Sequence, residues 1–570
     1  MTSQENVHFV EPSSTIEAHL PDGRVLSGPR GATAGLFLDA IQGEFTVPIV
    51  GAVINGQLRE LTYPLDFDAK IRPITLHDPD GMRFYRRSLT FVLEKAFHEL
   101  FPRAILSIDH SIASGGYFCQ VFNNATLDEE HLANLETRMR EIVEQDIPFI
   151  RERVPIRDAI AYFEKKGYRD KVQLLKHRKK DYLVLYNLND HRDYHHGYMV
   201  PSSGYLKWFK IAPMGDGFVM RFPRRHRPTE ILPMPDFSTL LNTFRQYGDW
   251  LQRLNIDNVG TLNQAIFENR TRELILVAEA LHEGRIAEIA SLIAQQIDQI
   301  RVILIAGPSS SGKTTFSKRL SIQLLARGIS PFPLEMDNYF VDRDLTPRDE
   351  NGEFDFETIK AVNTQRLGEE LAKLIAGESV QLPHFDFKTG VSSPGEVIQL
   401  HPGQIVILEG IHGLNPELIP KTPQEHTFRI YTSALTQLNL DWHNRVSTTD
   451  TRLIRRIVRD ARERGYSAQD TIARWESVRR GEKRNIFPYQ NNANIMFNSA
   501  MVYELAALKP LAEPVLRQVP YGTPEHIEAK RLLTMLEWFL PIESEFIPDN
   551  SLLREFIGSS ILKDFKIWKR

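Results

Sequence analysis

A phosphate-loop pattern constrains the fold of this 570-residue chain more than any other feature. The segment 307–314, GPSSSGKT, fits G-x-x-x-x-G-K-[ST]. A buried-strand pattern over 301–306 precedes it, and a helical pattern over 314–325 follows it. The glycines let the backbone turn its N–H groups toward phosphate oxygens, and the following helix directs its positive end at the same anion. The pattern therefore predicts a nucleotide-phosphate site between a strand and a helix.

The loop and a second strand end supply the expected ATP and Mg²⁺ contacts. Lys313 is expected to reach the β- and γ-phosphates, and the Thr314 hydroxyl is expected to bind Mg²⁺. The apolar strand pattern over 405–408 ends at Glu409, where an acid orients Mg²⁺ or its water shell. The residues expected to bind the nucleotide are Gly307, Ser309, Ser310, Ser311, Gly312, Lys313, Thr314 and Thr315.

Two further features bear on whether the chain only binds a nucleotide or transfers its phosphate. The strand pattern over 331–336 delivers Asp337 to a strand end, where ligands bind in open α/β sheets, although a loop aspartate is more often a cap or a solvated charge. In the helical pattern over 450–465, arginines recur on one face and outnumber the acids. We therefore favour an anion-binding face over a helix whose charges are simply solvated. These arginines are Arg452, Arg455, Arg459 and Arg462.

The order of patterns along the chain predicts several domains. Strands alternate with helices between 302 and 409, which predicts an α/β fold with a doubly wound parallel sheet. We expect a small β-rich domain at 1–75, in which Asn55-Gly56 marks a hairpin turn, and an α+β domain at 76–225. A helical linker at 226–299 and a phosphate-loop domain at 300–570, with a helical carboxyl-terminal tail, complete the expected order.

Composition limits the class of protein. The formal net charge of −4 argues against bulk nucleic-acid binding, and a single cysteine, Cys119, excludes an internal disulfide. Residues 1–6 lack the basic and apolar regions of a signal peptide, and no apolar run approaches the ~18 residues that span a bilayer. We therefore expect a soluble, cytoplasmic protein without a membrane partner.

From about 301 to 518 the chain resembles the uridine kinase/phosphoribulokinase family, and it is most similar to the uridine–cytidine kinase branch. The matching motifs occur in the family's order over some 200 residues. They are GPSSSGKTT at 307–315, MDNYF at 336–340, DFE at 355–357, PHFDF at 383–387, LEGI at 408–411 and DTRLIRRIVRD at 450–460.

This resemblance implies roles for individual residues. Asp337 would be the general base that takes the proton of the acceptor hydroxyl, and Glu357 would hold ribose hydroxyls. Phe385 and Phe387 would line the nucleoside pocket. Lys313, Arg455 and Arg459 would serve catalysis, and Arg452 would contact the substrate. Arg455, Arg459 and Arg464 would belong to the arginine lid over the nucleotide. The sequence departs from the family where Gly390 replaces a base-reading histidine, and where Asp470 or Gln469 stands in place of a glutamine.

The first half resembles a different family. Residues 15–74 are similar to a TGS domain, which implies a β-grasp-like fold, and the segment to about 225 resembles the second additional domain of threonyl-tRNA synthetase. Its two histidine or cysteine pairs align with Arg87, Phe91, His195 and Met199, so three of the four polar positions are lost. A metal site at His191, His195 and His196 is an alternative, but we expect solvated or hydrogen-bonded histidines there.

The leading hypothesis is an ATP-dependent kinase that phosphorylates the 5′-hydroxyl of a nucleoside. Two alternatives stay open: a phosphoribulokinase-like sugar kinase, and an RNA-binding regulator that only senses ATP. The expected partners are a nucleoside substrate, an RNA or nucleotide ligand at the amino-terminal half, and a second copy of the chain. The acceptor, the oligomeric state and any effector are not fixed by the sequence.

Overall fold

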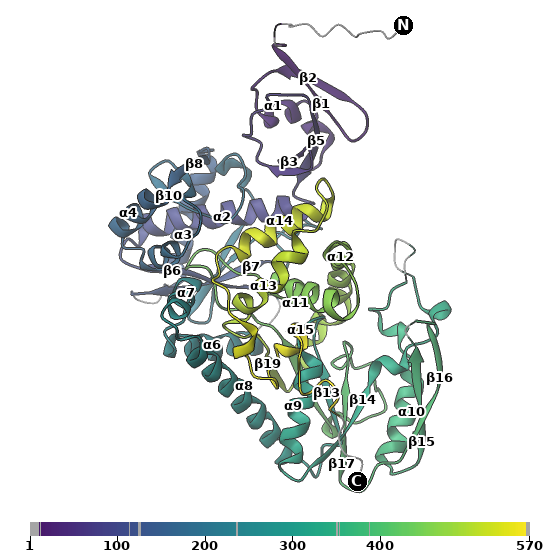
Figure 1. Cartoon of the computed structure of the whole chain (residues 1–570). Helices are drawn as coiled ribbons and strands as arrows, with labels where there is room; N and C mark the ends of the chain where they lie inside the picture. The colour runs from purple at the N-terminus through teal and green to yellow at the C-terminus, as the bar shows by residue number, and fades with distance from the viewer. Residues whose placement is uncertain are drawn as a thin grey trace, which may run out of the picture.

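The computed structural model describes residues 11, 13–112, 114–123, 127–234, 238–348, 352, 354–386 and 388–565. Figure 1 shows a small sheet near the amino terminus, a mixed α/β part beside it and a larger part built on a parallel sheet at the opposite end. The Phe387 position, expected in the acceptor pocket, lies outside the described residues.

The small amino-terminal part is a five-stranded sheet in the order β2-β1-β5-β3-β4. Its elements are β1 (Thr15–His19), β2 (Val25–Pro29), α1 (Ala34–Asp39), β3 (Ile49–Ile54), β4 (Gln57–Arg59) and β5 (Ala69–Thr75). Asn55 and Gly56 join β3 to β4 with φ angles of 46° and 75°. The expected hairpin with two left-handed residues is therefore confirmed.

The second part contains two antiparallel sheets, in the orders β11-β12-β7-β6 and β10-β9-β8. A long helix, α2 (Pro79–Leu100), packs on α3 (Glu129–Glu144), and its apolar side is buried in the same core. The remaining elements are β6 (Ile105–Ile112), β7 (Gly116–Phe122), β8 (Ile150–Pro155), α4 (Ile156–Lys166), α5 (Arg169–Lys176), β9 (Tyr182–Leu188), β10 (His191–Asp193), β11 (Lys210–Met214) and β12 (Gly217–Arg221).

Three helices follow: α6 (Ser238–Arg253), α7 (Val259–Phe267) and α8 (Thr271–Ala294). They occupy the segment expected to be a helical linker, but they are packed and do not act as a spacer. Helix α8 lies along α9 (Lys313–Leu325), and the two share one hydrophobic core. The buried Tyr503 hydroxyl donates to Glu279 Oε1 of α8 at 2.7 Å.

The large part is built on a five-stranded parallel sheet in the order β14-β17-β13-β18-β19. Ile303 and Ile305 pack in the core shared with α8 and α9, whereas Val302 and Leu304 pack with α10. Because alternate side chains are buried on opposite faces, helices cover the sheet on both sides. The elements are β13 (Val302–Ala306), β14 (Ser330–Glu335), α10 (Thr364–Ile375), β17 (Gln404–Glu409), β18 (Thr427–Ser433) and β19 (Ile495–Asn498). This confirms the expected doubly wound P-loop kinase fold.

A hairpin and a helical tail complete this part. The hairpin, β15 (Val380–Asp386) with β16 (Val391–Ile398), stands beside α10 at the edge of the molecule (Figure 1). The tail consists of α11 (Thr448–Glu463), α12 (Ala468–Asn485), α13 (Glu504–Leu516), α14 (Pro524–Leu536) and α15 (Arg554–Ile557).

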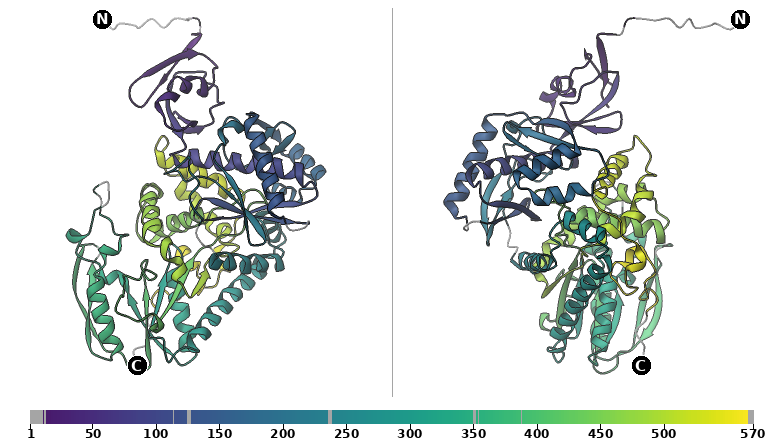
Figure 2. Two further views of the ribbon diagram at one scale, coloured as in Figure 1. Left: turned by 180° about the vertical axis from the view of Figure 1, so that it is seen from behind. Right: turned by 60° about the vertical axis from the view of Figure 1, so that its left-hand side comes forward.

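The amino-terminal parts contact the tail directly, and Figure 2 shows α14 beside α2 from further directions. Arg83 of α2 pairs with Glu528 of α14, with Nη1 3.0 Å from Oε2. The Tyr521 hydroxyl donates to Asn55 O at 2.9 Å, at the tip of the amino-terminal hairpin. Among the described residues, no helix is long and apolar enough to cross a membrane.

Candidate active site

The phosphate loop joins β13 to α9 with backbone geometry suited to an anion. Ser310 and Gly312 have φ angles of 57° and 83°, and a Cβ at Gly307 would lie 1.9 Å from Thr432 O. The hydroxyls of Ser310 and Ser311 are buried without a hydrogen-bond partner. A larger residue at Gly307 would therefore force the loop away from β18, and the loop keeps unsatisfied polar groups for a ligand.

The carboxyl ends of three neighbouring strands bring the predicted catalytic residues together. Thr314 Oγ1 lies 3.2 Å from Glu409 Oε1 and 3.1 Å from Oε2, at the end of β17. Asp337 follows β14, which is paired with β17. Burial raises the pKa of Asp337, Glu357 and Glu409, and the Lys313 ammonium opposes that rise in all three, so its charge reaches each of these acids.

Burial has the largest effect on the pKa values of these acids. It raises the pKa of Glu409 to about 7; the negative charges of Glu555 and Asp337 add to the effect, and Lys313 opposes it. The Asp337 side chain reaches solvent, but the protein around its other sides still raises its pKa above the ordinary value. A partly desolvated carboxyl beside a lysine is the usual setting of a general base.

Helix α11 places two of the predicted arginines behind the loop. Arg452 Nε donates to Ser309 O at 2.9 Å, and Arg455 Nη1 donates to Ser310 O at 3.4 Å. Arg455 is fully buried and its Nε donates to Glu504 Oε2 at 2.6 Å. These two side chains therefore hold the loop in shape from inside the fold. That placement differs from the expected lid, and any direct role toward phosphate stays a prediction.

The other lid arginines are more accessible. Arg459 Nη2 donates to Asp460 Oδ1 at 2.8 Å, and Arg464 Nη1 lies 3.6 Å from the same oxygen. The Arg464 side chain is half-exposed and its charge lowers the pKa of Asp337. Among the arginines expected in the lid, Arg464 is thus one whose charge acts on Asp337. Arg462, on the same helix, instead donates to Phe556 O at 2.5 Å.

Two acids that sequence reasoning missed bind the N–H groups of the loop. Ser309 N donates to Glu482 Oε1 at 3.0 Å, and Thr315 N donates to Glu555 Oε2 at 3.2 Å. Glu482 comes from α12 and Glu555 from α15, more than 160 residues away in each case. No local pattern signals such long-range contacts. They show that these N–H groups donate to anionic oxygens.

The expected acceptor pocket lies at the β15–β16 hairpin. Phe385 is buried, with its ring centroid 5.7 Å from that of Phe340. Gly390 has a φ of 75°, and a Cβ there would lie 2.7 Å from Arg343 Nε. Arg343, which sequence reasoning missed, therefore fills the space beside Gly390. Glu357 lies against α12, where Gly481 leaves room for its side chain.

The residues fit ATP and Mg²⁺. The Thr314 hydroxyl and the Glu409 carboxylate are oxygen donors of the kind that Mg²⁺ prefers. The loop N–H groups and the start of α9 suit phosphate oxygens. The assigned roles of the individual residues stay predictions.

The positions aligned with the synthetase histidine pairs are filled by side chains that hold the fold together. Arg87 Nη1 donates to Tyr198 O, and burial lowers the pKa of Arg87 to about 10. The Phe91 ring lies edge-on to His191 and His195, with centroids 4.8 and 5.4 Å away. Met199 is buried in the same core. No described side chain at the first pair can bind a metal.

Comparison with known proteins agrees with this geometry. Residues 302–506 match the Phosphoribulokinase / Uridine kinase family, so this part of the chain is a P-loop kinase domain. A possible uridine kinase from Bacillus stearothermophilus is 19% identical, covers 36% of this chain and 98% of its own, and has a TM-score of 0.24. A D-glycerate 3-kinase from Cryptococcus neoformans is 14% identical, covers 46% and 89%, and has a TM-score of 0.21.

The amino-terminal region matches threonine–tRNA ligases. The ligase of Thermotoga petrophila is 29% identical over 206 residues, which cover 36% of this chain and 31% of the ligase. The ligase of Thermotoga neapolitana is 30% identical over 205 residues, with the same two shares. The chain therefore spans about a third of the length of these ligases, and both expected resemblances are confirmed.

Replacing Glu555 with glutamine should strengthen ATP binding. The Glu555 carboxylate accepts the hydrogen bond of the Thr315 N–H group, and its negative charge would repel a phosphate at that position. Glutamine keeps the size and removes the charge, so we expect the KM for ATP to fall by about threefold to tenfold. Steady-state kinetics at varied ATP concentration would measure the KM for ATP. Glu545→Gln, in the same tail, is the matched control. An unchanged or raised KM would show that Glu555 does not compete with the nucleotide.

Proposed function

We propose that this protein transfers the γ-phosphate of ATP to the 5′-hydroxyl of a nucleoside. One observation supports it most: Lys313, Thr314, Glu409 and Asp337 meet at the carboxyl edge of one parallel sheet. A protein that only senses ATP needs the first three residues but has no use for a base at the fourth position.

In the proposed reaction, the chain positions two reactants and moves one proton. The loop N–H groups and Lys313 hold the phosphates, and the lysine offsets the charge that develops on the transferred group. Mg²⁺, when held by Thr314 and Glu409, would supply further charge on the phosphate oxygens. Asp337 takes the proton from the acceptor hydroxyl as its oxygen forms the new bond to phosphorus and the bond to ADP breaks.

The acceptor pocket favours a flat ring bearing hydroxyl groups. Phe385 and Phe340 place two aromatic rings at the hairpin, on which a base would stack, and the Glu357 carboxylate would accept hydrogen bonds from ribose hydroxyls. Gly390 removes a side chain that would read the base edge, and we therefore expect weak discrimination among bases, within ~10–200-fold. A bare sugar phosphate would leave the aromatic faces unused.

A panel assay tests the proposal. ADP release by the purified full chain would be measured with ribonucleosides, deoxynucleosides, sugars and sugar phosphates as acceptors. The proposal expects ribonucleosides to stimulate release most strongly. Stimulation by a sugar or sugar phosphate alone would favour the phosphoribulokinase-like alternative, and no stimulation by any acceptor would favour an ATP sensor.

Glu357→Gln should weaken binding of the acceptor nucleoside and leave binding of ATP unchanged. Loss of a charged hydrogen-bond acceptor predicts a rise of about 10–100-fold in the KM for the nucleoside. Burial, helped by Glu482, raises the pKa of Glu357 to about 7. The carboxyl is ionised above that pKa, so the wild-type KM should fall as pH rises through about 7, whereas that of Glu357→Gln should stay flat. Equal use of ribonucleosides and 2′-deoxynucleosides by the wild type would show that Glu357 has another role.

The chain should not hydrolyse mischarged tRNA. Such hydrolysis needs a metal or a set of imidazoles that reaches the ester, but the aligned first pair here is Arg87 and Phe91. We expect the full chain to leave a mischarged threonine-specific tRNA intact at the spontaneous rate, measured by release of the labelled amino acid. A threonine–tRNA ligase with editing activity serves as the positive control, and release above the spontaneous rate would refute the expectation.

A further inference from the structure

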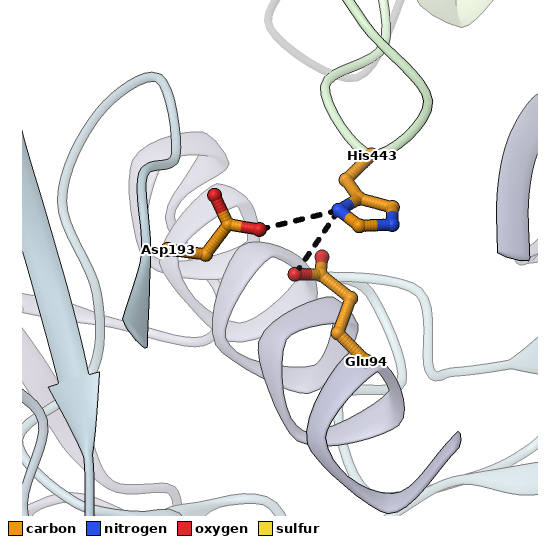
Figure 3. Close-up of side chains that lie close together, drawn as sticks. All are labelled: Glu94, Asp193 and His443. Carbon is orange, nitrogen blue, oxygen red and sulfur yellow. Dashed lines mark hydrogen bonds and ion pairs between the residues drawn. The ribbon is translucent and has the colours of Figure 1, made fainter. Parts of the chain in front are cut away.

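A group of buried charged side chains joins the amino-terminal parts to the kinase part. Glu94 of α2, Asp193 of β10 and His443 of the segment before α11 form its centre (Figure 3). Glu94 and Asp193 are fully buried, and His443 is 5% exposed. Their ligand atoms lie within 4.8 Å of one another. Three distant segments of the chain therefore converge on one point.

Two of the separations in this group match those between ligands of one metal ion. His443 Nδ1 lies 3.3 Å from Glu94 Oε2 and 3.3 Å from Asp193 Oδ2. This is long for an N–H···O hydrogen bond, which prefers about 2.7–3.2 Å. It matches the ~3.3 Å edge of a tetrahedron whose corners lie 2.0–2.1 Å from a central zinc ion. Figure 3 shows both carboxylates directed at the same ring nitrogen.

Hydrogen bonding does not satisfy Glu94. A single nitrogen carries at most one proton, so His443 Nδ1 cannot donate to both carboxylates. Among the described residues, neither oxygen of Glu94 accepts a hydrogen bond of good geometry, although imidazole nitrogens lie beside both: His195 Nε2 is 2.9 Å from Oε1 and His443 Nδ1 is 3.3 Å from Oε2. A fully buried carboxylate without hydrogen bonds is costly, unless it pairs with a charge or coordinates a metal.

The surrounding charges also favour a cation. Glu94, Asp170, Asp193 and Asp441 are four buried acids, and Lys171 is the buried ammonium among them. Lys171 Nζ lies 3.0 Å from Asp193 Oδ1 and 3.4 Å from Asp441 Oδ1. It therefore binds the far oxygen of Asp193 and leaves Oδ2 facing Glu94 and His443. A single ammonium does not balance the group.

We propose that Glu94, Asp193 and His443 bind a divalent first-row transition metal such as Zn²⁺. Carboxylate oxygen and imidazole nitrogen are the donors that such ions accept. His191 Nε2, 3.7 Å from Glu94 Oε2, is placed to complete the coordination, or a water takes that position. His195 Nε2 lies 2.9 Å from the other oxygen of Glu94, the place that a second-shell group takes beside a metal-binding carboxylate.

The site revises the expectation for the histidines of β10 and the turn after it. His196 faces away, with its Nδ1 3.4 Å from Trp538 Nε1, whereas His191 and His195 both face Glu94. The decisive ligands come from elsewhere, because Glu94 and His443 are distant in sequence from this stretch. Since the group is closed to solvent, the metal would hold the parts together and would not act on a substrate.

Metal content of the full chain tests the proposal. The protein, purified without a histidine tag, would be incubated with Zn²⁺, desalted and analysed for bound metal by mass spectrometry. We expect about one ion per chain. Co²⁺ in its place should give visible d–d absorption, and chelation should lower the melting temperature by on the order of 5 °C, reversibly. Less than about 0.1 ion per chain and no d–d bands in the folded wild type would overturn the proposal, leaving protonated imidazoles as the counter-charges.

Two variants identify the ligands. Glu94→Gln and His443→Gln keep the size of each side chain, and both should reduce the retained metal at least tenfold. His131→Gln is the matched control, because His131 forms a similar pair with Asp128 on the surface, with Nδ1 2.6 Å from Oδ1. Retention of one ion by both ligand variants would place the metal elsewhere and contradict the proposal. If a variant does not fold, the wild-type cobalt spectrum and the effect of chelation still decide.

Discussion

Lys313→Ala is expected to abolish phosphoryl transfer, with a loss of ~10³ or more in turnover. The Lys313 charge reaches Asp337, Glu357 and Glu409, and it is the cation that the loop presents to phosphate. Within the part of the chain that the structure describes, its Nζ donates to Pro308 O at 3.3 Å, a long contact whose loss the fold should tolerate. ADP release under saturating acceptor and ATP measures the loss.

The melting temperature separates a catalytic loss from a folding loss. We expect Lys313→Ala to melt within a few degrees of the wild type, since its ammonium is not part of a buried pair. Lys373→Ala, an exposed lysine on α10, is the matched control and should keep full turnover. Near-normal turnover in a folded Lys313→Ala protein would refute the assignment of the phosphate loop.

Asp337→Asn is expected to slow transfer by ~10²–10⁴ while ATP binding stays nearly intact. Asparagine keeps the shape at the end of β14 but cannot accept the proton of an acceptor hydroxyl. ATP affinity and turnover would be measured on the same protein. Because the pKa of Asp337 is raised, wild-type turnover should fall as pH is lowered through that pKa, and the variant should lose this dependence.

The neighbouring acid Glu335 provides the control for Asp337. It is exposed on the same strand end, and Glu335→Gln should retain turnover close to the wild type. Parallel losses of ATP affinity and turnover in Asp337→Asn would contradict a general base and would make Asp337 part of the Mg²⁺ site instead.

Much of the fold was predictable because local patterns determine it. The strand at Val302–Ala306 and the helix at Lys313–Leu325 match the predicted ranges of 301–306 and 314–325 to within one residue, because the apolar spacing of a strand or helix is present in the local sequence. The role of the helices at 238–294 was not predictable from such patterns. Whether amphipathic helices span a gap or pack on a neighbour depends on distant surfaces, and here the neighbour is α9.

The residues of the candidate site also fall into those that local motifs predict and those that only tertiary contacts bring together. The loop, Asp337 and Glu409 were predictable because strand ends and glycine spacing lie in contiguous segments. Arg455 was expected on a lid, but its partner Glu504 lies 49 residues away and draws it into the core. Glu482 and Glu555 reach the loop through tertiary contacts that no motif encodes. The proposed metal ligands Glu94 and His443 were missed for the same reason.

The central claim is that the chain phosphorylates a nucleoside, and the identity of the product tests it most directly. The full chain would be incubated with γ-labelled ATP, Mg²⁺ and an equimolar mixture of ribonucleosides, and the products would be separated and identified by mass spectrometry. We predict label in nucleoside 5′-monophosphates. The Asp337→Asn protein should form at most about 1% of the labelled product that the wild type forms. Consumption of ATP with all the label in inorganic phosphate, and none in any nucleoside, would contradict it.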